Sequence, residues 1–268
     1  NFDGLQTLSN VVTTQEAPII TTAVQSTKFE LLEVSEIKTE IESVFLDGIE
    51  YIETTDTKLN QDTDEFTILG WIEPDFSKGS HKSTVISKMD SFTMFLLKDS
   101  YQVEGGQTVT VPVRTINFSL YDGVEWYTIF GKTEITEGWH QVAAVVDGST
   151  VTLYLDGNIE EKLNLTKKVI LGSSQSTATC PQIECFADVE VSISDADVII
   201  GAYISKIMIT NQYGELEPKR TVKDNFSGLV STPEIFSDAF TKKQISKLYE
   251  ENKNSYQRSL TIDYVPIG

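Results

Sequence analysis

Histidine is the residue type to test first for chemistry, because near neutral pH its side chain can act as an acid, a base or a metal ligand. One of the two histidines, His140, lies in "GWHQVAAVVDGSTVTLYLDG", residues 138–157, directly after Trp139. Alternation along this stretch gives both faces apolar residues, as in a strand at the middle of a sandwich. The other, His81, lies in the polar stretch "SKGSHKS". We interpret His140 as a packed, hydrogen-bonded residue and His81 as a solvated one.

Paired carboxylates would indicate glycoside hydrolysis, which needs two acids flanking the bond to be broken. The stretch "ECFADVE" places Glu184, Asp188 and Glu190 on one face of a strand. However, the turn-like "CPQIEC" overlaps this stretch at Cys185, where a regular strand would be needed. No phosphate-binding glycine loop and no Gly-x-Ser-x-Gly motif occurs. The sequence therefore predicts that the chain is not an enzyme, with a glycoside hydrolase as a distant alternative.

Alternating acidic residues favour a calcium site. Asn60, Asp62 and Asp64 alternate in "NQDTDEF", and Asp195 and Asp197 alternate in "SDADV". Calcium takes six to eight oxygen ligands, which acidic loops between strands supply. We predict Ca²⁺ as the cofactor, with these five side chains as candidate ligands. The alternative is that acids fall close together by chance in a chain with a net charge of −19.

Aromatic side chains beside polar groups would form a platform for a sugar. Tyr121, Trp126 and Tyr127 are the candidate ligand-binding residues, and Tyr154 is a further aromatic of this kind. The alternative is that these rings belong to the core or the rim of a sandwich, as most aromatic residues do.

The cysteines and the glycosylation motifs both favour export. Cys180 and Cys185 in "CPQIEC" lack the further ligands of a zinc site, so we predict a disulfide formed in an oxidising compartment. The motif N-x-S/T predicts glycosylation at Asn117, Asn164 and Asn225. The numbering begins at Asn1 rather than Met, so we expect either removal of a leader or excision from a longer chain. The predicted location is extracellular, at the cell surface.

The charge of the chain excludes two classes of partner. With 21 basic and 40 acidic residues, it repels nucleic acid and anionic membranes. No run of 18 apolar residues is present, so no membrane insertion is predicted.

Regular turn signals predict an all-β fold. From about residue 44, β-rich runs are separated by Asp-Gly pairs, which supply the positive φ angles of tight turns. A spacing of about ten residues between turns is typical of antiparallel sandwiches and barrels. One helix is predicted in "TKKQISKLYEENK", where Thr241 and Gln244 form a capping box and Ile245, Leu248 and Tyr249 make an apolar stripe.

The stretches "EFTILGWIEPDF", "GWHQVAAVVDGSTVTLYLDGN", "VIIGAY" and "FSGLVSTPEIFSDAFTKKQISKLYEE" follow one another in the order of a known family. Together they resemble the concanavalin A-like, laminin G-like jelly-roll domains of extracellular proteins. The resemblance covers residues 44–251 and implies an antiparallel jelly-roll β-sandwich, often with a calcium ion, in which Trp139 and His140 belong to a structural hairpin. The chain departs from the family by an insertion at about 203–224 and by Ser231 in place of an Asp.

Two extended terminal segments flank this domain. Residues 1–43 are rich in Thr, Val and Ile and read as an edge or donor strand, and residues 252–268 read as a C-terminal tail strand. We predict an exported, non-catalytic cell-surface domain for adhesion or for binding glycans or surface proteins. The alternative is a structural subunit of an extracellular filament or lattice that self-associates by exchange of its terminal strands.

Overall fold

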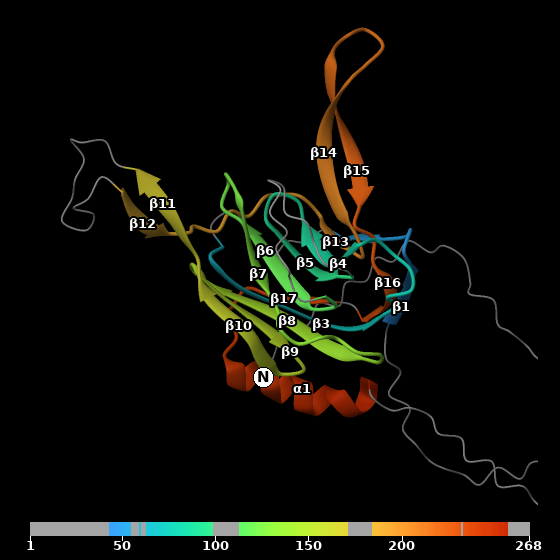
Figure 1. Cartoon of the computed structure of the whole chain (residues 1–268), viewed down its shortest axis with the longest axis vertical. Helices are drawn as coiled ribbons and strands as arrows, with labels where there is room; N and C mark the ends of the chain where they lie inside the picture. Colours follow the sequence, from blue (N-terminus) through green and yellow to red (C-terminus); the bar gives the residue numbers. More distant parts are fainter. Residues whose placement is uncertain are drawn as a thin grey trace, which may run out of the picture.

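The computed structural model describes residues 43–54, 59, 63–98, 113–170, 184–231 and 233–256. Figure 1 shows two sheets stacked face to face, with one helix against the outer side of the lower sheet and two ribbons that extend away from the sandwich. The predicted antiparallel β-sandwich with one short C-terminal helix is confirmed. The predicted terminal strands fall almost entirely on residues 1–42 and 257–268, which lie outside the described residues.

The first sheet has seven strands, and its path is β1 (Ser43–Asp47), β16 (Ser227–Ser231), β3 (Glu65–Pro74), β8 (His140–Asp147), β9 (Thr150–Leu155) and β10 (Asn158–Asn164), with β17 (Glu234–Phe236) also paired to β3. The second sheet has six strands, in the order β2 (Ile52–Thr54), β13 (Val198–Ile200), β4 (Lys82–Lys88), β5 (Phe92–Leu97), β6 (Ile116–Tyr121) and β7 (Trp126–Phe130).

The core lies between the two sheets and takes every second side chain of their strands. Phe66 of β3 is fully buried against Phe92 of β5, with ring centroids 5.7 Å apart. Phe118 of β6 continues the row, 6.1 Å from Phe92. Each buried phenylalanine contributes about 2–3 kcal/mol, so this row joins the sheets firmly. The side chains between these core residues point to the outer face of the second sheet.

Asp-Gly turns connect neighbouring strands at two of the predicted places. Asp147 pairs with Thr150 across a tight turn between β8 and β9, in which Gly148 has a φ of 56°. Asp156 and Gly157 form a further two-residue turn, between β9 and β10, with φ angles of 49° and 72°. Gly123, with φ of 90°, turns the chain between β6 and β7. Gly48 also has a positive φ of 91°, but here β1 joins the first sheet and β2 the second. That Asp-Gly pair therefore carries the chain from one sheet to the other and makes no hairpin.

The helix α1 (Lys242–Tyr256) begins with the predicted capping box. The backbone N–H of Thr241 donates to Oε1 of Gln244 at 2.9 Å, and the backbone N–H of Gln244 donates to Oγ1 of Thr241 at 3.4 Å. The helix continues past the predicted domain end at residue 251. Residues 252–256, predicted as the start of the tail strand, are helical instead, because the apolar stripe continues to Tyr256.

The apolar stripe of α1 packs on the outer face of the first sheet. Ile245 is fully buried in a small cluster there, and Leu248 packs against the same cluster. Trp71 of β3 stacks on two rings of the helix, with centroids 5.7 Å from Tyr249 and 4.3 Å from Tyr256. The helix thus covers the outer face of the first sheet, and it does not cover the outer face of the second sheet.

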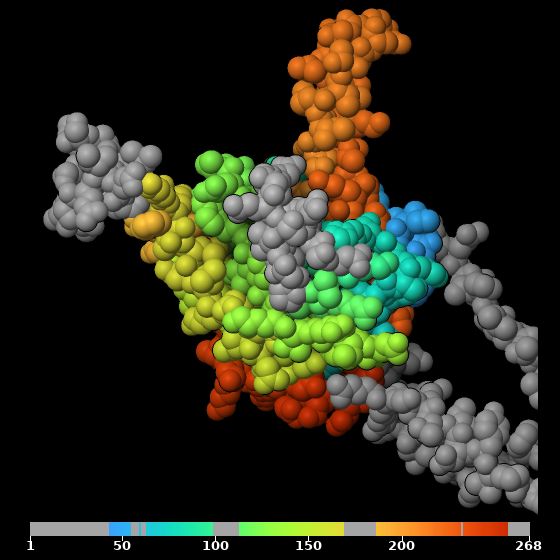
Figure 2. Space-filling view, in the orientation of Figure 1, coloured from blue at the N-terminus to red at the C-terminus, as the bar shows by residue number. Residues whose placement is uncertain are grey.

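Two ribbons extend from the sandwich. One pairs β11 (Thr166–Ile170) with β12 (Glu184–Asp188), and the other pairs β14 (Tyr203–Thr210) with β15 (Leu216–Lys223). The insertion predicted at about 203–224 is this second hairpin, which stands clear of the body in orange in Figure 2. In the described part of the chain, no helix has the length and apolar character that a membrane crossing requires.

Candidate functional site

A row of hydroxyl side chains crosses the outer face of the second sheet. Ser87, Thr93, Ser119 and Thr128 stand opposite one another on β4, β5, β6 and β7. Ser119 and Thr128 share a hydrogen bond of 2.7 Å, and Ser87 donates to the carbonyl of Ala202 at 2.8 Å. Oγ1 of Thr93 is buried and has no hydrogen-bond partner. An unsatisfied buried hydroxyl of this kind is commonly explained by strain or by a buried water molecule.

Three aromatic rings lie beside this row. Trp126 of β7 has 38% of its surface exposed, and its ring centroid lies 5.1 Å from that of Tyr121, its cross-strand partner on β6. Tyr203, the first residue of β14, meets Trp126 edge-on at 6.3 Å. Aromatic rings combine a large apolar face with polar edges, so they suit ligands that are apolar on one side. We call these three rings and the hydroxyl row the aromatic–hydroxyl face.

Two lysines border the ring of Tyr203. Nζ of Lys223 lies 5.3 Å from its centroid, and Nζ of Lys82 lies 6.0 Å from it and 4.0 Å from the centroid of Phe95. Burial lowers the pKa of Lys82, while Asp224 opposes this shift and Lys223 adds to it. Burial also raises the pKa of Asp224. The polar groups of this corner are thus partly withdrawn from water.

The hairpin is fixed to the sheet at both of its feet. Ser87 binds Ala202 just before β14, and the backbone N–H of Thr84 donates to the carbonyl of Asp224, just after β15, at 2.7 Å. Asp224 has a positive φ of 58°, a conformation that Asp adopts more readily than most residues other than glycine.

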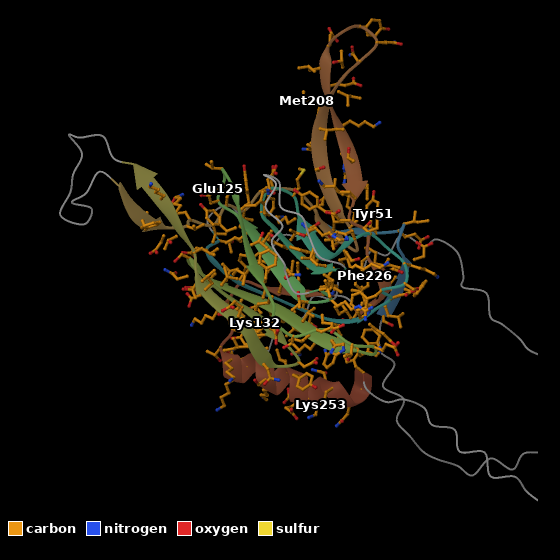
Figure 3. All side chains as sticks on the ribbon, viewed as in Figure 1. Tyr51, Glu125, Lys132, Met208, Phe226 and Lys253 are labelled. Atoms are coloured by element: carbon orange, nitrogen blue, oxygen red, sulfur yellow. The ribbon has the colours of Figure 1, made fainter. Side chains whose placement is uncertain are left out.

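The structure joins two of the three predicted aromatic residues. Tyr121 and Trp126 are paired, whereas Tyr127 points to the core and its hydroxyl donates to Oε1 of Glu125 at 2.6 Å. Figure 3 labels Glu125 at the turn that joins β6 and β7, beside the site. Burial and this hydrogen bond raise the pKa of Tyr127. Tyr154 belongs to the cluster under α1, on the other sheet.

Sequence reasoning missed Tyr203, Lys82 and Lys223. Tyr203 and Lys223 belong to the inserted hairpin and lie far from Trp126 along the chain. The insertion at about 203–224 was the only feature of the sequence that pointed to Tyr203 and Lys223.

His140 has the structural role that the sequence predicted. Its Nδ1 lies 2.8 Å from Oδ2 of Asp156, and its Nε2 lies 3.4 Å from Oγ1 of Thr136. Trp139 contacts Tyr256 of the helix, with ring centroids 5.0 Å apart. These contacts join the start of β8 to the turn after β9 and to the helix.

The predicted calcium ligands are not brought together in the part that is described. Asp64 precedes β3, whereas Asp195 and Asp197 precede β13 on the other sheet. Within the described residues, no three His, Cys, Asp or Glu side chains gather as metal ligands would. Asn60 and Asp62 lie outside the described residues, so calcium stays a prediction.

The predicted modification sites differ in access. Asn117 is fully buried and its Nδ2 donates to the carbonyl of Thr115 at 2.8 Å, so the prediction of a glycan there is wrong for the folded chain. Asn164 is exposed and Asn225 is half-buried, and glycosylation of both stays a prediction. The disulfide also stays a prediction, because Cys180 and the side chain of Cys185 lie outside what the structure describes.

The side chains of two of the three acids considered for hydrolysis are described. Asp188 is on the β11–β12 ribbon, where its Oδ1 accepts a hydrogen bond from Asn164 at 3.2 Å, and Glu190 follows the ribbon with an exposed side chain. The side chain of Glu184 lies outside the described residues.

A cavity of about 590 Å³ lies elsewhere, at the rim of the first sheet. It is lined by the aromatic residues Phe45 and Phe76, by Arg114, and by the carboxylates Glu73, Asp75 and Glu137. The carboxylate of Asp75 is already bonded to the backbone and the hydroxyl of Ser77. We prefer the aromatic–hydroxyl face as the candidate site, because it combines an exposed tryptophan with two further aromatic rings.

Residues 46–179, half of the chain, match the model of a family described as the concanavalin A-like lectin/glucanases superfamily. The chain belongs to this family. Its resemblance to laminin G-like jelly rolls is thereby confirmed. The family contains both lectins and glucanases, so membership alone does not separate binding from hydrolysis.

Solved structures with a related architecture include the CBM40 domain of a Ruminococcus gnavus IT-sialidase, with 12% identity, a TM-score of 0.48, and coverage of 78% of this chain and 96% of that one. Another is domain 4 of the arabinanase AbnA from Geobacillus stearothermophilus in complex with arabinotriose, with 18% identity, a TM-score of 0.45, and coverage of 77% and 76%. At this level of similarity the comparison identifies no ligand. No curated protein sequence matches the chain significantly.

Proposed function

We propose that this chain is a non-catalytic glycan-binding domain that binds sugar on its aromatic–hydroxyl face. The observation that carries the proposal is the exposed ring of Trp126, which lies against Tyr121 and Tyr203 beside a row of hydroxyl groups. A pyranose ring has an apolar C–H face that packs on an aromatic ring. Membership of a lectin-containing family supports the same function.

The carboxylates near Trp126 favour binding of a sugar without its hydrolysis. Asp122, at the turn next to Trp126, is held by the backbone N–H groups of Val124 and Glu125 and by Lys167. Glu125 is bonded to Tyr127. A glycosidase needs two carboxyl groups placed to act on opposite sides of one glycosidic bond. These two acids are already used to hold the turn.

The test is binding of fluorescent protein to a glycan array, followed by titration calorimetry with the best ligand. Trp126→Ala should abolish binding and leave the melting temperature within about 2 °C, because the ring is partly exposed. Phe45→Ala is the matched control, since it removes an aromatic ring that is 53% exposed at the rim cavity. Loss of binding in the Phe45 variant alone would move the site to that cavity. Release of reducing sugar by the wild-type chain would show an enzyme instead.

We further propose that the domain acts outside the cell, in adhesion to glycan-bearing surfaces. The predicted disulfide and the exposed motif at Asn164 support this location. Calcium assistance belongs to the same proposal, on the strength of the alternating acids in the sequence. Localisation of the tagged chain by antibody on unpermeabilised cells tests the location.

A second candidate function is assembly through the edge of the first sheet. Among the described strands, β1 is outermost in this sheet, and Val44 and Phe45 are 39% and 53% exposed on it. An apolar strand at a sheet edge can pair with a strand of another chain. We propose as the alternative that terminal strands add at this edge to form an extracellular filament. Light scattering on the full chain, and on Phe45→Lys, tests it: a monomer in both cases would contradict assembly.

A further inference from the structure

Lys82 carries a half-buried positive charge without an acceptor. Its Nζ lies between two aromatic rings, 4.0 Å from the centroid of Phe95 and 6.0 Å from that of Tyr203. Among the residues that the structure describes, no oxygen forms a hydrogen bond or an ion pair with this ammonium. Buried charges in proteins are paired or bind a ligand, because an unpaired charge is costly. Asp224 attracts this charge but makes no ion pair with it, so Lys82 lacks an anion in direct contact.

A second ammonium faces the same ring. Nζ of Lys223 lies 5.3 Å from the centroid of Tyr203, and Lys223 depresses the pKa of Lys82 by repulsion. Neither lysine forms an ion pair with Asp224, although Asp224 follows Lys223 directly in the chain. An anion that lies between the two lysines removes their mutual repulsion and gives Lys82 its missing partner.

The hairpin gives this corner a local charge opposite to that of the chain. The strands β14 and β15 and their turn carry four basic residues and two acidic ones, whereas the whole chain has a net charge of −19. Charges on the surface are screened beyond about 8 Å at physiological ionic strength. An anion at Lys82 and Lys223 therefore responds mainly to the charges close to it, which are these two lysines and the carboxylates of Asp224 and Asp90.

We propose that the sugar bound on the aromatic–hydroxyl face is an acidic sugar, whose carboxylate or sulfate lies between Lys82 and Lys223 while its ring packs on Trp126. This inference rests on the proposed glycan binding and names the class of sugar. The lysines supply charge-assisted hydrogen bonds, which are stronger than neutral ones and select a charged substituent.

The experiment measures the affinity of the full chain for matched charged and neutral ligands by calorimetry, after a glycan array has been screened. Tetragalacturonate and its methyl ester form the carboxylate pair, and chondroitin sulfate and desulfated chondroitin form the sulfate pair. The expected result is tighter binding of one charged member by about tenfold or more. Lys82→Met and Lys223→Met should each remove most of this preference, because they lower the affinity for the charged member far more than the affinity for the neutral one.

Two further variants guard against trivial effects. Lys162→Met on β10 makes the same change in net charge on the other sheet and should leave the preference intact. Lys82→Arg keeps the charge and should restore it even if Lys82→Met lowers the melting temperature. Equal affinity for charged and neutral ligands, with binding still lost in Trp126→Ala, would overturn the acidic-sugar inference alone. Absence of binding to every glycan on the array would overturn the proposed function and this inference with it.

Discussion

Asp156 binds His140 through a contact of 2.8 Å between Oδ2 of the aspartate and Nδ1 of the histidine. This contact joins the turn after β9 to the start of β8. Oδ1 of the same carboxylate accepts the backbone N–H of Gln141 at 2.9 Å, and the backbone N–H of Asp156 donates to the carbonyl of Gln141 at 2.8 Å. The start of β8 is thereby fixed to the turn between β9 and β10. Histidine and aspartate form a pair here that serves the fold.

Asp156→Ala should lower the free energy of unfolding by about 3 kcal/mol, measured by urea denaturation. The variant loses charge-assisted hydrogen bonds worth about 1.5–3 kcal/mol. It also places alanine at a φ of 49°, where only residues such as Gly, Asn and Asp are well tolerated. Asp156→Asn keeps an acceptor and tolerates this φ, so its loss should be less than half as large. Equal stability of wild type and Asp156→Ala would contradict the structural role.

Thr93→Val should stabilise the free protein. The hydroxyl of Thr93 is buried without a partner, which costs about 1–3 kcal/mol, and valine has nearly the same shape. The free protein should therefore become more stable, with a higher melting temperature. Ser119→Ala is the comparison, because its hydroxyl is bonded to Thr128 and its loss should destabilise the free protein. A Thr93→Val variant of lower stability would show that the hydroxyl has a partner in the fold.

Tyr256→Ala should destabilise the first sheet without affecting the proposed site. The ring of Tyr256 stacks on Trp71 at 4.3 Å and contacts Trp139 at 5.0 Å. Removing a packed aromatic side chain costs about 3 kcal/mol, which chemical denaturation would detect. Lys253→Ala, at a neighbouring position of α1 labelled in Figure 3, should change the stability by less than about 0.5 kcal/mol. A loss of glycan affinity in Tyr256→Ala at a temperature where it remains folded would place the ligand on the helix side.

Local rules predicted the parts of the fold that depend on neighbours in sequence. Asp156 and Gly157 form a turn because their φ angles suit it, and Thr241 caps α1 because its hydroxyl reaches the next turn. Gly48 turns the chain as its sequence predicts, but the destination of the following strand depends on the packing of two sheets. The local sequence pattern does not determine which sheet a strand joins, because an apolar strand can pair in either sheet.

The site was predicted in part for the same reason. Tyr121 and Trp126 lie on either side of one turn, so their pairing follows from the hairpin alone. Tyr203 comes to Trp126 only because Ala202 and Asp224 anchor the inserted hairpin on β4. Nor does the sequence distinguish half-buried Lys82 from the other lysines of the chain. Burial is a property of the assembled sheet.

Calcium should raise the melting temperature if the predicted site exists. Binding that occurs only in the folded state stabilises it by about 2.7 kcal/mol when the free ion is at 100 times its dissociation constant. We expect the transition measured in CaCl₂ to lie several degrees above that in EDTA, and Asp195→Asn to reduce the difference. Mg²⁺ at the same concentration controls for general screening of the acidic chain. Identical transitions in CaCl₂ and EDTA would contradict the prediction.

The affinity for an acidic glycan should fall as the pH rises into the alkaline range. The fall should occur at a lower pH than it would if Lys82 had the pKa of an ordinary lysine. Only the protonated ammonium of Lys82 binds the anion, and burial lowers its pKa from the usual 10.5, so the charge is lost earlier as the pH rises. Lys223, Asp224 and Tyr203 are the charged and titratable groups around it, with His81 next to Asp224 and Asp90 next to Tyr203. Burial and the nearby carboxylates raise the pKa of Tyr203, so its hydroxyl stays neutral over this range. Calorimetric titrations between pH 6 and 10 should show the decline in wild type, no such decline in Lys82→Met, and a shift to higher pH in Lys82→Arg. A decline that persists unchanged in Lys82→Met would assign the titration to another group.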